Sequence, residues 1–123
     1  MAGGAESVLV VDDEPSIRLL CKVNLELEGY RVLEAGTLEA ARAHLRNERV
    51  SVVLLDVHVG ADDGRELLAE LRAERPEVPI ALFSGTTEPR SISSFGADAI
   101  IPKPFTLDEL AGTVERLAGS ARV

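Results

Sequence analysis

Three acids, a serine and a lysine each stand shortly after an apolar run: Asp12, Asp13, Asp56, Ser84 and Lys103. If those runs are parallel strands of one sheet, the five side chains meet at one edge of it. Carboxylates at close range repel one another unless they are protonated or neutralised, and a hard divalent cation such as Mg²⁺ suits their oxygens. A hydroxyl and an ammonium suit the oxygens of a phosphoryl group. The set predicts phosphoryl transfer to a carboxylate, with Asp56 as nucleophile and Asp12 and Asp13 as metal ligands.

Each of these residues also has an ordinary structural interpretation, and the combination is what favours chemistry. An acid can cap a helix, a serine can belong to a turn, and a lysine can be a surface charge. Among the other reactive residues, His44 is expected on an exposed helix face and Cys21 in the core. His58, two positions after Asp56, is expected to influence the access of water to it. Neither histidine has a second one at metal-ligand spacing, which argues against zinc.

Short apolar runs alternate with segments of helical periodicity along the chain. Pro15 suits the first turn of a helix and Gly29 suits its end. Thr37 can cap the next helix, and Thr106 with Glu109 forms a capping-box pattern before the last one. The expected strands cover residues 7–11, 30–35, 51–55, 80–83 and 99–101, and the expected helices cover 15–28, 38–48, 65–74, 88–95 and 107–118.

This alternation predicts an α/β fold, a five-stranded parallel sheet doubly wound by helices as (βα)5. The near-continuous apolar run at 51–55 is typical of a central strand that is covered on both faces. A doubly wound sheet binds its ligands at the carboxyl ends of its strands. That is where the chemically capable residues are expected.

Length and composition narrow the class of protein. A chain of 123 residues, 46% of them hydrophobic, is enough for one domain with its own core. We assign the domain to residues 7–119, with a flexible tail at 1–6 and a C-terminal tail at 120–123. The formal net charge of -8 and the 3% of aromatic residues argue against nucleic-acid binding by this domain. A single cysteine and the lack of a recognisable signal peptide or membrane span predict a cytoplasmic protein.

The motifs at the strand ends resemble those of a known family. VLVVDDEPSIR, VVLLDVHVGADDG, LFSG and GADAIIPKPF are together similar to the receiver domains of two-component response regulators, and the resemblance covers residues 7–118. It implies a flavodoxin-like strand order of 2-1-3-4-5. It also implies a phosphorylation-dependent signalling switch rather than an enzyme, one that assists only its own phosphorylation and dephosphorylation.

The resemblance assigns roles to the acids. It implies that Asp56 accepts a phosphoryl group from a sensor histidine kinase or a phosphotransfer protein. It implies that Mg²⁺ is held by Asp12, Asp13, Asp56 and the backbone carbonyl of His58.

The resemblance also implies how the site would switch. Ser84 and Lys103 would move toward the phosphoryl group and shift an existing equilibrium between two arrangements of the fourth and fifth strands. The Lys103–Pro104 peptide bond would be cis, and Gly64 would close the loop after Asp56. The usual switch aromatic aligns with Ile100, which cannot make a hydrogen-bonded swing, and the segment 84–96 is shorter than in common receivers.

Two other functions remain open. A pseudo-receiver that binds a partner without cycling phosphate would fit the isoleucine at position 100. A phosphatase with an aspartate nucleophile would want a second acid where His58 stands, and usually a cap domain. A nucleotide-binding domain is disfavoured because the chain has no glycine-rich phosphate loop. The sequence does not identify the kinase, the signal, the output or the effector. It also does not distinguish a stand-alone protein from part of a larger one. The oligomeric state is open, and a weak dimer is compatible with the sequence.

Overall fold

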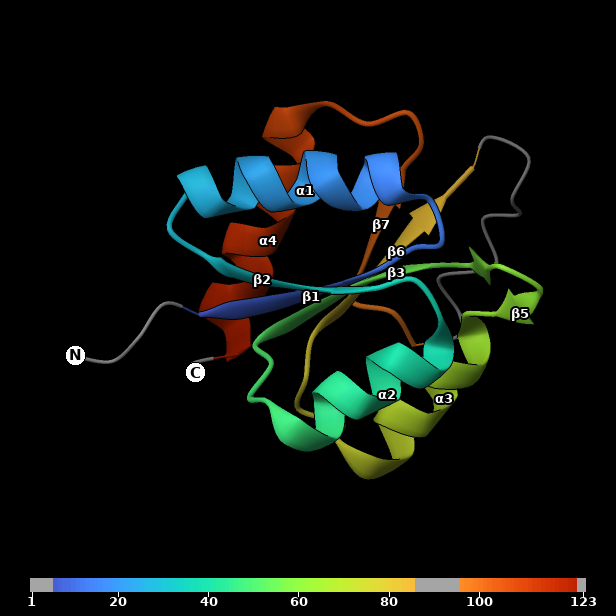
Figure 1. The fold of residues 1–123 in the computed structure, drawn as a ribbon. Helices are drawn as coiled ribbons and strands as arrows, with labels where there is room; N and C mark the ends of the chain where they lie inside the picture. Colours follow the sequence, from blue (N-terminus) through green and yellow to red (C-terminus); the bar gives the residue numbers. More distant parts are fainter. Residues whose placement is uncertain (1–5, 86–95, 122–123) are drawn as a thin grey trace.

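A computed structural model describes residues 6–85 and 96–121 of the protein. Five parallel strands form one sheet in the order β2-β1-β3-β6-β7 (Figure 1). Because β4 and β5 form a separate two-stranded sheet, this is the order 2-1-3-4-5 among the parallel strands, as the family resemblance implied. The helix predicted at 88–95 and most of the predicted N-terminal tail lie outside the described residues. The elements are β1 (Ser7–Val11), α1 (Pro15–Leu27), β2 (Arg31–Ala35), α2 (Leu38–Asn47), β3 (Val52–Asp56), β4 (His58–Val59), β5 (Asp62–Asp63), α3 (Arg65–Glu74), β6 (Ile80–Ser84), β7 (Ala99–Pro102) and α4 (Leu107–Ala121).

The core has two layers, one on each face of the sheet. Helices α2 and α3 cover one face, and α1 and α4 cover the other (Figure 1). Along β1, Leu9 and Val11 pack under α2 and α3, whereas Val8 and Val10 pack under α1 and α4. Because both faces are covered, consecutive residues of the central strands are all apolar, as the sequence predicted.

Local signals in the sequence set the ends of the helices. The hydroxyl oxygen of Thr37 accepts a hydrogen bond from the Ala40 N–H at 3.0 Å, so the predicted cap of α2 is confirmed. The capping box before α4 is also confirmed, because the Thr106 N–H donates to the Glu109 carboxylate and the Glu109 N–H donates to the Thr106 hydroxyl. Gly29, with a φ of 96°, ends α1.

Several element ends, and one small hairpin, differ from the prediction. Tyr30 was expected in the second strand, but its N–H donates to the carbonyl of Leu25 and closes the end of α1. Helix α4 continues to Ala121, whereas the last predicted helix covered residues 107–118. The hairpin of β4 and β5, which turns at Gly60 with a φ of 62°, was not expected because strands of two residues have no readable periodicity.

No helix in residues 6–85 and 96–121 is both long enough and apolar enough to cross a membrane.

Candidate functional site

An acidic cluster lies where the carboxyl ends of β1 and β3 come together. Asp12 directly follows β1 and Asp56 is the last residue of β3, and these two strands are neighbours in the sheet. Carboxylate oxygens of Asp12, Asp13 and Asp56 all lie within 4.8 Å of one another. The structure therefore brings the three predicted acids together. The chain passes from β1 to β2 on one side and then crosses to β3 on the other side of β1, and such a reversal of strand order is where doubly wound sheets bind ligands.

Lys103 joins this cluster from the far edge of the sheet. Its ammonium nitrogen donates to a carboxylate oxygen of Asp12 at 2.8 Å and to one of Asp56 at 3.0 Å. The same nitrogen lies 5.4 Å from the centre of the Phe83 ring, which gives the ammonium a cation–π contact as well. The peptide bond between Lys103 and Pro104 is cis, as the family resemblance implied.

Asp12 is fully buried, and hydrogen bonds hold both its backbone and its side chain. Its N–H donates to the carbonyl of Ala35 at 3.0 Å, and its carbonyl accepts from the Arg18 guanidinium at 2.6 Å. One carboxylate oxygen accepts from the Glu14 N–H at 2.9 Å and the other accepts from Lys103. Nothing in the sequence pattern pointed to Arg18, since a side chain that reaches a backbone carbonyl leaves no motif.

Burial and neighbouring charges change the pKa values of Asp12 and Lys103 in different ways. Burial is the largest influence on Asp12 and raises the pKa of its carboxyl, although the hydrogen bond from Lys103 opposes the change. Burial alone would lower the pKa of Lys103, but its hydrogen bonds to Asp12 and Asp56, together with the negative charges of these carboxylates, outweigh burial and raise the pKa. The ammonium is therefore held in its charged form, between carboxylates that need a cation.

Asp56 lies at the mouth of the site, with 14% of its side chain exposed. One of its carboxylate oxygens accepts from the backbone N–H of His58 at 3.3 Å, and the side chain of His58 is exposed. The loop after Asp56 is closed by Gly64, as predicted, because the Gly64 N–H donates to the carbonyl of Val57 at 2.6 Å. A Cβ on Gly64 would lie 2.0 Å from the backbone oxygen of Asp56, so only glycine fits.

Ser84 lies on the same rim but in a different contact. It ends β6, one residue beyond Phe83, which is in register with Asp56. In the described part of the chain its hydroxyl donates to the carbonyl of Gly85 at 3.3 Å. Its own carbonyl accepts from the Lys103 N–H at 2.7 Å, so the serine and the lysine are connected through the backbone.

The remaining reactive side chains have structural surroundings. Cys21 is buried, as predicted, and burial raises the pKa of its thiol to about 12, which makes it unreactive. The prediction that His44 is exposed was wrong, because the residue is half-buried. Its Nε2 lies 2.9 Å from the carbonyl oxygen of Glu34 on β2, the edge strand of the sheet.

A family model for the response regulator receiver domain matches residues 8–115. The chain belongs to this family. Receiver domains are the phosphorylation-dependent signalling modules of two-component systems, and they are generally not enzymes.

Similar proteins place this receiver domain among two-component regulators. It is 35% identical over 111 residues to the probable transcriptional regulatory protein TcrX of Mycobacterium tuberculosis, a match that covers 88% of this chain and 47% of TcrX. It is 37% identical over 120 residues to the sensor kinase CckA of Brucella abortus, covering 93% of this chain and 13% of CckA. Among solved structures, a CheY-like receiver domain protein from Methanospirillum hungatei superposes with a TM-score of 0.89 at 29% identity, covering 97% of this chain and 98% of that one. The chain thus spans less than half of the length of these two curated relatives.

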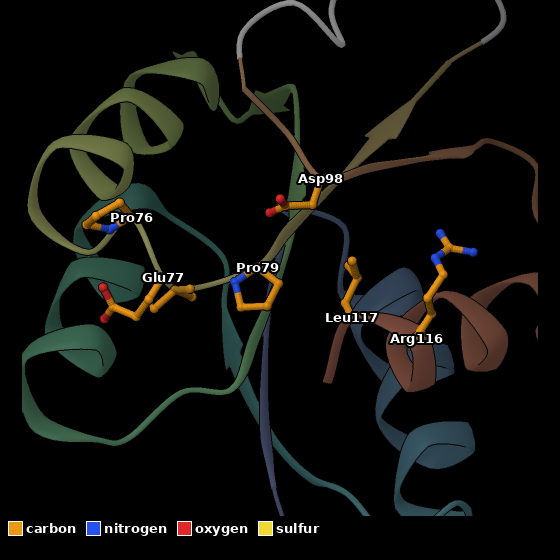
Figure 2. Close-up of a pocket in the computed structure, with 7 residues that line it drawn as sticks. Pro76, Glu77, Pro79, Asp98, Arg116 and Leu117 are labelled. Carbon is orange, nitrogen blue, oxygen red and sulfur yellow. The ribbon is translucent and has the colours of Figure 1, made fainter. Parts of the chain in front are cut away.

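The receiver domain also has a surface pocket away from the acids, at the end of the sheet where β6 begins (Figure 2). Its volume is about 380 Å³, and it lies between the turn that leads into β6 and the helix α4. Its polar residues have opposite charges and come from separate elements. None of the acids of the cluster lines this pocket, whose lining consists of Pro76, Glu77, Val78, Pro79, Asp98, Arg116 and Leu117.

Proposed function

We propose that this receiver domain is switched by phosphorylation of Asp56 and that the acidic cluster holds Mg²⁺ for the transfer. The observation that carries the proposal is the position of the Lys103 ammonium, which donates to Asp56 at 3.0 Å and to Asp12 at 2.8 Å. A cation in that place is matched to the charge of a phosphoryl group on Asp56.

The donor set fits a hard divalent cation. Ionised, Asp12, Asp13 and Asp56 carry three negative charges and Lys103 carries one positive charge, which leaves about two uncompensated negative charges within one cluster of side chains. Mg²⁺ takes oxygen ligands and usually needs only one or two carboxylates, with water and phosphate for the rest. Asp12, Asp13, Asp56 and the backbone carbonyl of His58 are the proposed ligands. When bound, the ion would offset the charge on the phosphoryl oxygens.

The proposed reaction is a direct transfer. A carboxylate oxygen of Asp56 forms a bond to the phosphorus of a phosphohistidine on a kinase or phosphotransfer protein. The phosphorus–nitrogen bond breaks, and its electron pair stays with the imidazole of the donor. Lys103 stabilises the negative charge of the phosphoryl oxygens, and Ser84 is the proposed hydroxyl donor to one of them. The domain assists only its own phosphorylation and dephosphorylation, and a downstream effector reads the result.

The test is stoichiometric labelling by a small phosphodonor. Incubation with acetyl phosphate and MgCl₂ should add one phosphoryl group per chain, as measured by intact-protein mass spectrometry, and chelation of the metal should prevent it. Asp56→Asn should abolish labelling while leaving the fold intact. Glu66→Gln, at an exposed acid on α3, is a matched control that should be labelled like the wild type.

Two outcomes would overturn the proposal. Equal labelling of the wild type and of Asp56→Asn would place the phosphoryl group elsewhere. A wild type that binds MgCl₂ but accepts no phosphoryl group would favour the pseudo-receiver, and continuous turnover of the phosphodonor without a labelled intermediate would favour a phosphatase.

A further inference from the structure

Arg18 connects the acidic cluster to the neighbouring edge of the sheet. It lies on the first turns of α1, and its guanidinium donates to the backbone carbonyl of Asp12 at 2.6 Å. The same guanidinium lies 3.4 Å from the carboxylate of Glu34 on β2. Only 19% of the Arg18 side chain is exposed, so the contact is partly shielded from water.

Gly36 leaves room for this arrangement. A Cβ at that position would lie 3.0 Å from Nη1 of Arg18, which is tighter than an ordinary contact. The guanidinium is therefore confined between the turn after β2 and the carbonyl of Asp12.

The carbonyl of Asp12 belongs to the peptide unit that carries Asp13. The carbonyl of one residue and the N–H of the next belong to the same planar peptide unit. With the N–H of Asp12 bonded to Ala35 and its carbonyl bonded to Arg18, the peptide planes on both sides of Asp12 are fixed. The side chain of Asp12 is tied separately, by Glu14 and Lys103. Asp13 is exposed, and its backbone N and Cα lie in the peptide plane that Arg18 holds, so that plane positions the point from which its side chain projects.

We propose that Arg18 is a positioning residue that sets the affinity of the acidic cluster for Mg²⁺, by holding the Asp12–Asp13 peptide unit in the orientation that brings Asp13 beside Asp12 and Asp56. This inference rests on the proposed function, since it takes the cluster to be the Mg²⁺ site. Arg18 itself touches neither the ion nor the phosphoryl group.

A purely electrostatic role for Arg18 makes the opposite prediction. A positive charge next to a cation site repels the cation, so removing the charge alone should strengthen Mg²⁺ binding. Removing a positioning contact should weaken it, because residues that orient metal ligands typically contribute about 10- to 100-fold to metal affinity. The direction of the change therefore separates the two roles.

Lys22 provides a matched control one turn further along α1. It also lies near Glu34, with its nitrogen 3.8 Å from the carboxylate. The backbone carbonyl of Asp12 accepts from Arg18 and not from this lysine. Lys22→Met thus removes one positive charge and one contact to Glu34 but leaves the Asp12–Asp13 peptide unit held.

The experiment is an equilibrium titration of the unphosphorylated 123-residue chain with MgCl₂, followed by isothermal titration calorimetry and by the backbone amide signals of Asp12 and Asp13 in ¹⁵N NMR spectra. We expect Arg18→Met to weaken Mg²⁺ binding about tenfold and to shift or broaden the Asp13 amide signal before any metal is added. Lys22→Met should stay within about twofold of the wild type, because exposed ion pairs contribute little.

A second variant keeps the inference testable if Arg18→Met does not fold. Gly36→Val retains every charge and crowds the guanidinium, so it should weaken Mg²⁺ binding in the same direction. Arg18→Lys should restore part of the affinity lost in Arg18→Met, since an ammonium can still donate to the carbonyl.

The outcomes also separate this inference from the proposed function. Wild type that does not bind MgCl₂ would refute the metal site itself. Wild type that binds, together with folded Arg18→Met that binds equally or more tightly, would refute the positioning role and leave the site standing.

Discussion

The closure of the loop after Asp56 can be tested by Gly64→Ala. Gly64 is buried, and its N–H donates to the carbonyl of Val57 at 2.6 Å. A Cβ there would lie 2.0 Å from the backbone oxygen of Asp56 and 3.2 Å from that of Val57. The first contact is with backbone, which cannot turn aside as a flexible side chain can. The substitution must therefore displace the chain on one side of the contact or the other.

The size of the displacement follows from the contact distance. Real Cβ contacts are essentially never shorter than 3.0 Å, so the two atoms must separate by about 1 Å from 2.0 Å. Overpacking of this kind costs about 1–3 kcal/mol of folding free energy. A misplacement of about 1 Å at a reacting group can slow a reaction about 100-fold. We expect the rate of labelling by acetyl phosphate to fall by that order while the domain stays folded.

Gly85→Ala is the matched control for this variant. Gly85 follows Ser84 on the same rim, and among residues 6–85 and 96–121 no atom lies within 4 Å of a Cβ built there. The labelling rate and the Tm should be measured for wild type and both alanine variants under identical conditions. Labelling of Gly64→Ala at the wild-type rate would refute the argument from the close contact, and an equal loss in both variants would show that the rim tolerates no alanine at all.

Three further measurements probe charge and packing. Because burial raises the pKa of Asp12 in the folded state, the folded protein holds that proton more tightly than the unfolded chain, and the contribution of Asp12 to stability falls as pH rises through the raised pKa. The free energy of unfolding should therefore be measured in urea for the wild type and for Asp12→Asn at several pH values. The value for Asp12→Asn minus the value for the wild type should rise with pH above the ordinary aspartate range. A difference that falls with pH would contradict the raised pKa of Asp12. Two hydrogen bonds from Arg42 to Glu70 join α2 to α3 at a half-exposed site. A double-mutant cycle on this pair should therefore give a coupling free energy of about 0.5 kcal/mol, and the coupling should become smaller in high salt. A coupling that salt does not change would contradict a screened ion pair. Leu54→Ala, at a fully buried position on β3, should cost about 3 kcal/mol and lower the Tm by about 10 °C, which calorimetry can check.

The placement of the acids was predictable because two simple regularities coincide. The run of apolar residues marks each buried strand, and parallel strands put their carboxyl ends at one edge. The sequence alone therefore predicts that Asp56 and Lys103, which are far apart in the chain, lie at one site. The 3.0 Å contact between them agrees with that reasoning.

What the sequence did not predict depends on geometry rather than on residue type. The bond from Arg18 to the carbonyl of Asp12 uses a side chain that could equally have pointed to solvent. His44 was expected to be exposed on its helix, but its ring nitrogen donates a hydrogen bond to the carbonyl of Glu34 on the edge strand. Neither contact follows from periodicity, since both need the relative position of a helix and a strand.

The isoleucine at position 100 constrains how a signal could leave this site. Ile100 is 37% exposed on β7 and has no polar group, so it cannot report on the phosphoryl group by a hydrogen bond. Lys103, by contrast, is bonded through its side chain to Asp56 and through its N–H to the carbonyl of Ser84. A phosphoryl group on Asp56 would compete with the carboxylates for the Lys103 ammonium. In the pairing of β6 with β7, Ser84 is in register with Pro102, which directly precedes Lys103. Any shift of Lys103 would therefore act directly on the backbone pairing of these two strands. In this receiver domain the backbone at the ends of these two strands therefore offers a route from the site to the surface that needs no aromatic side chain.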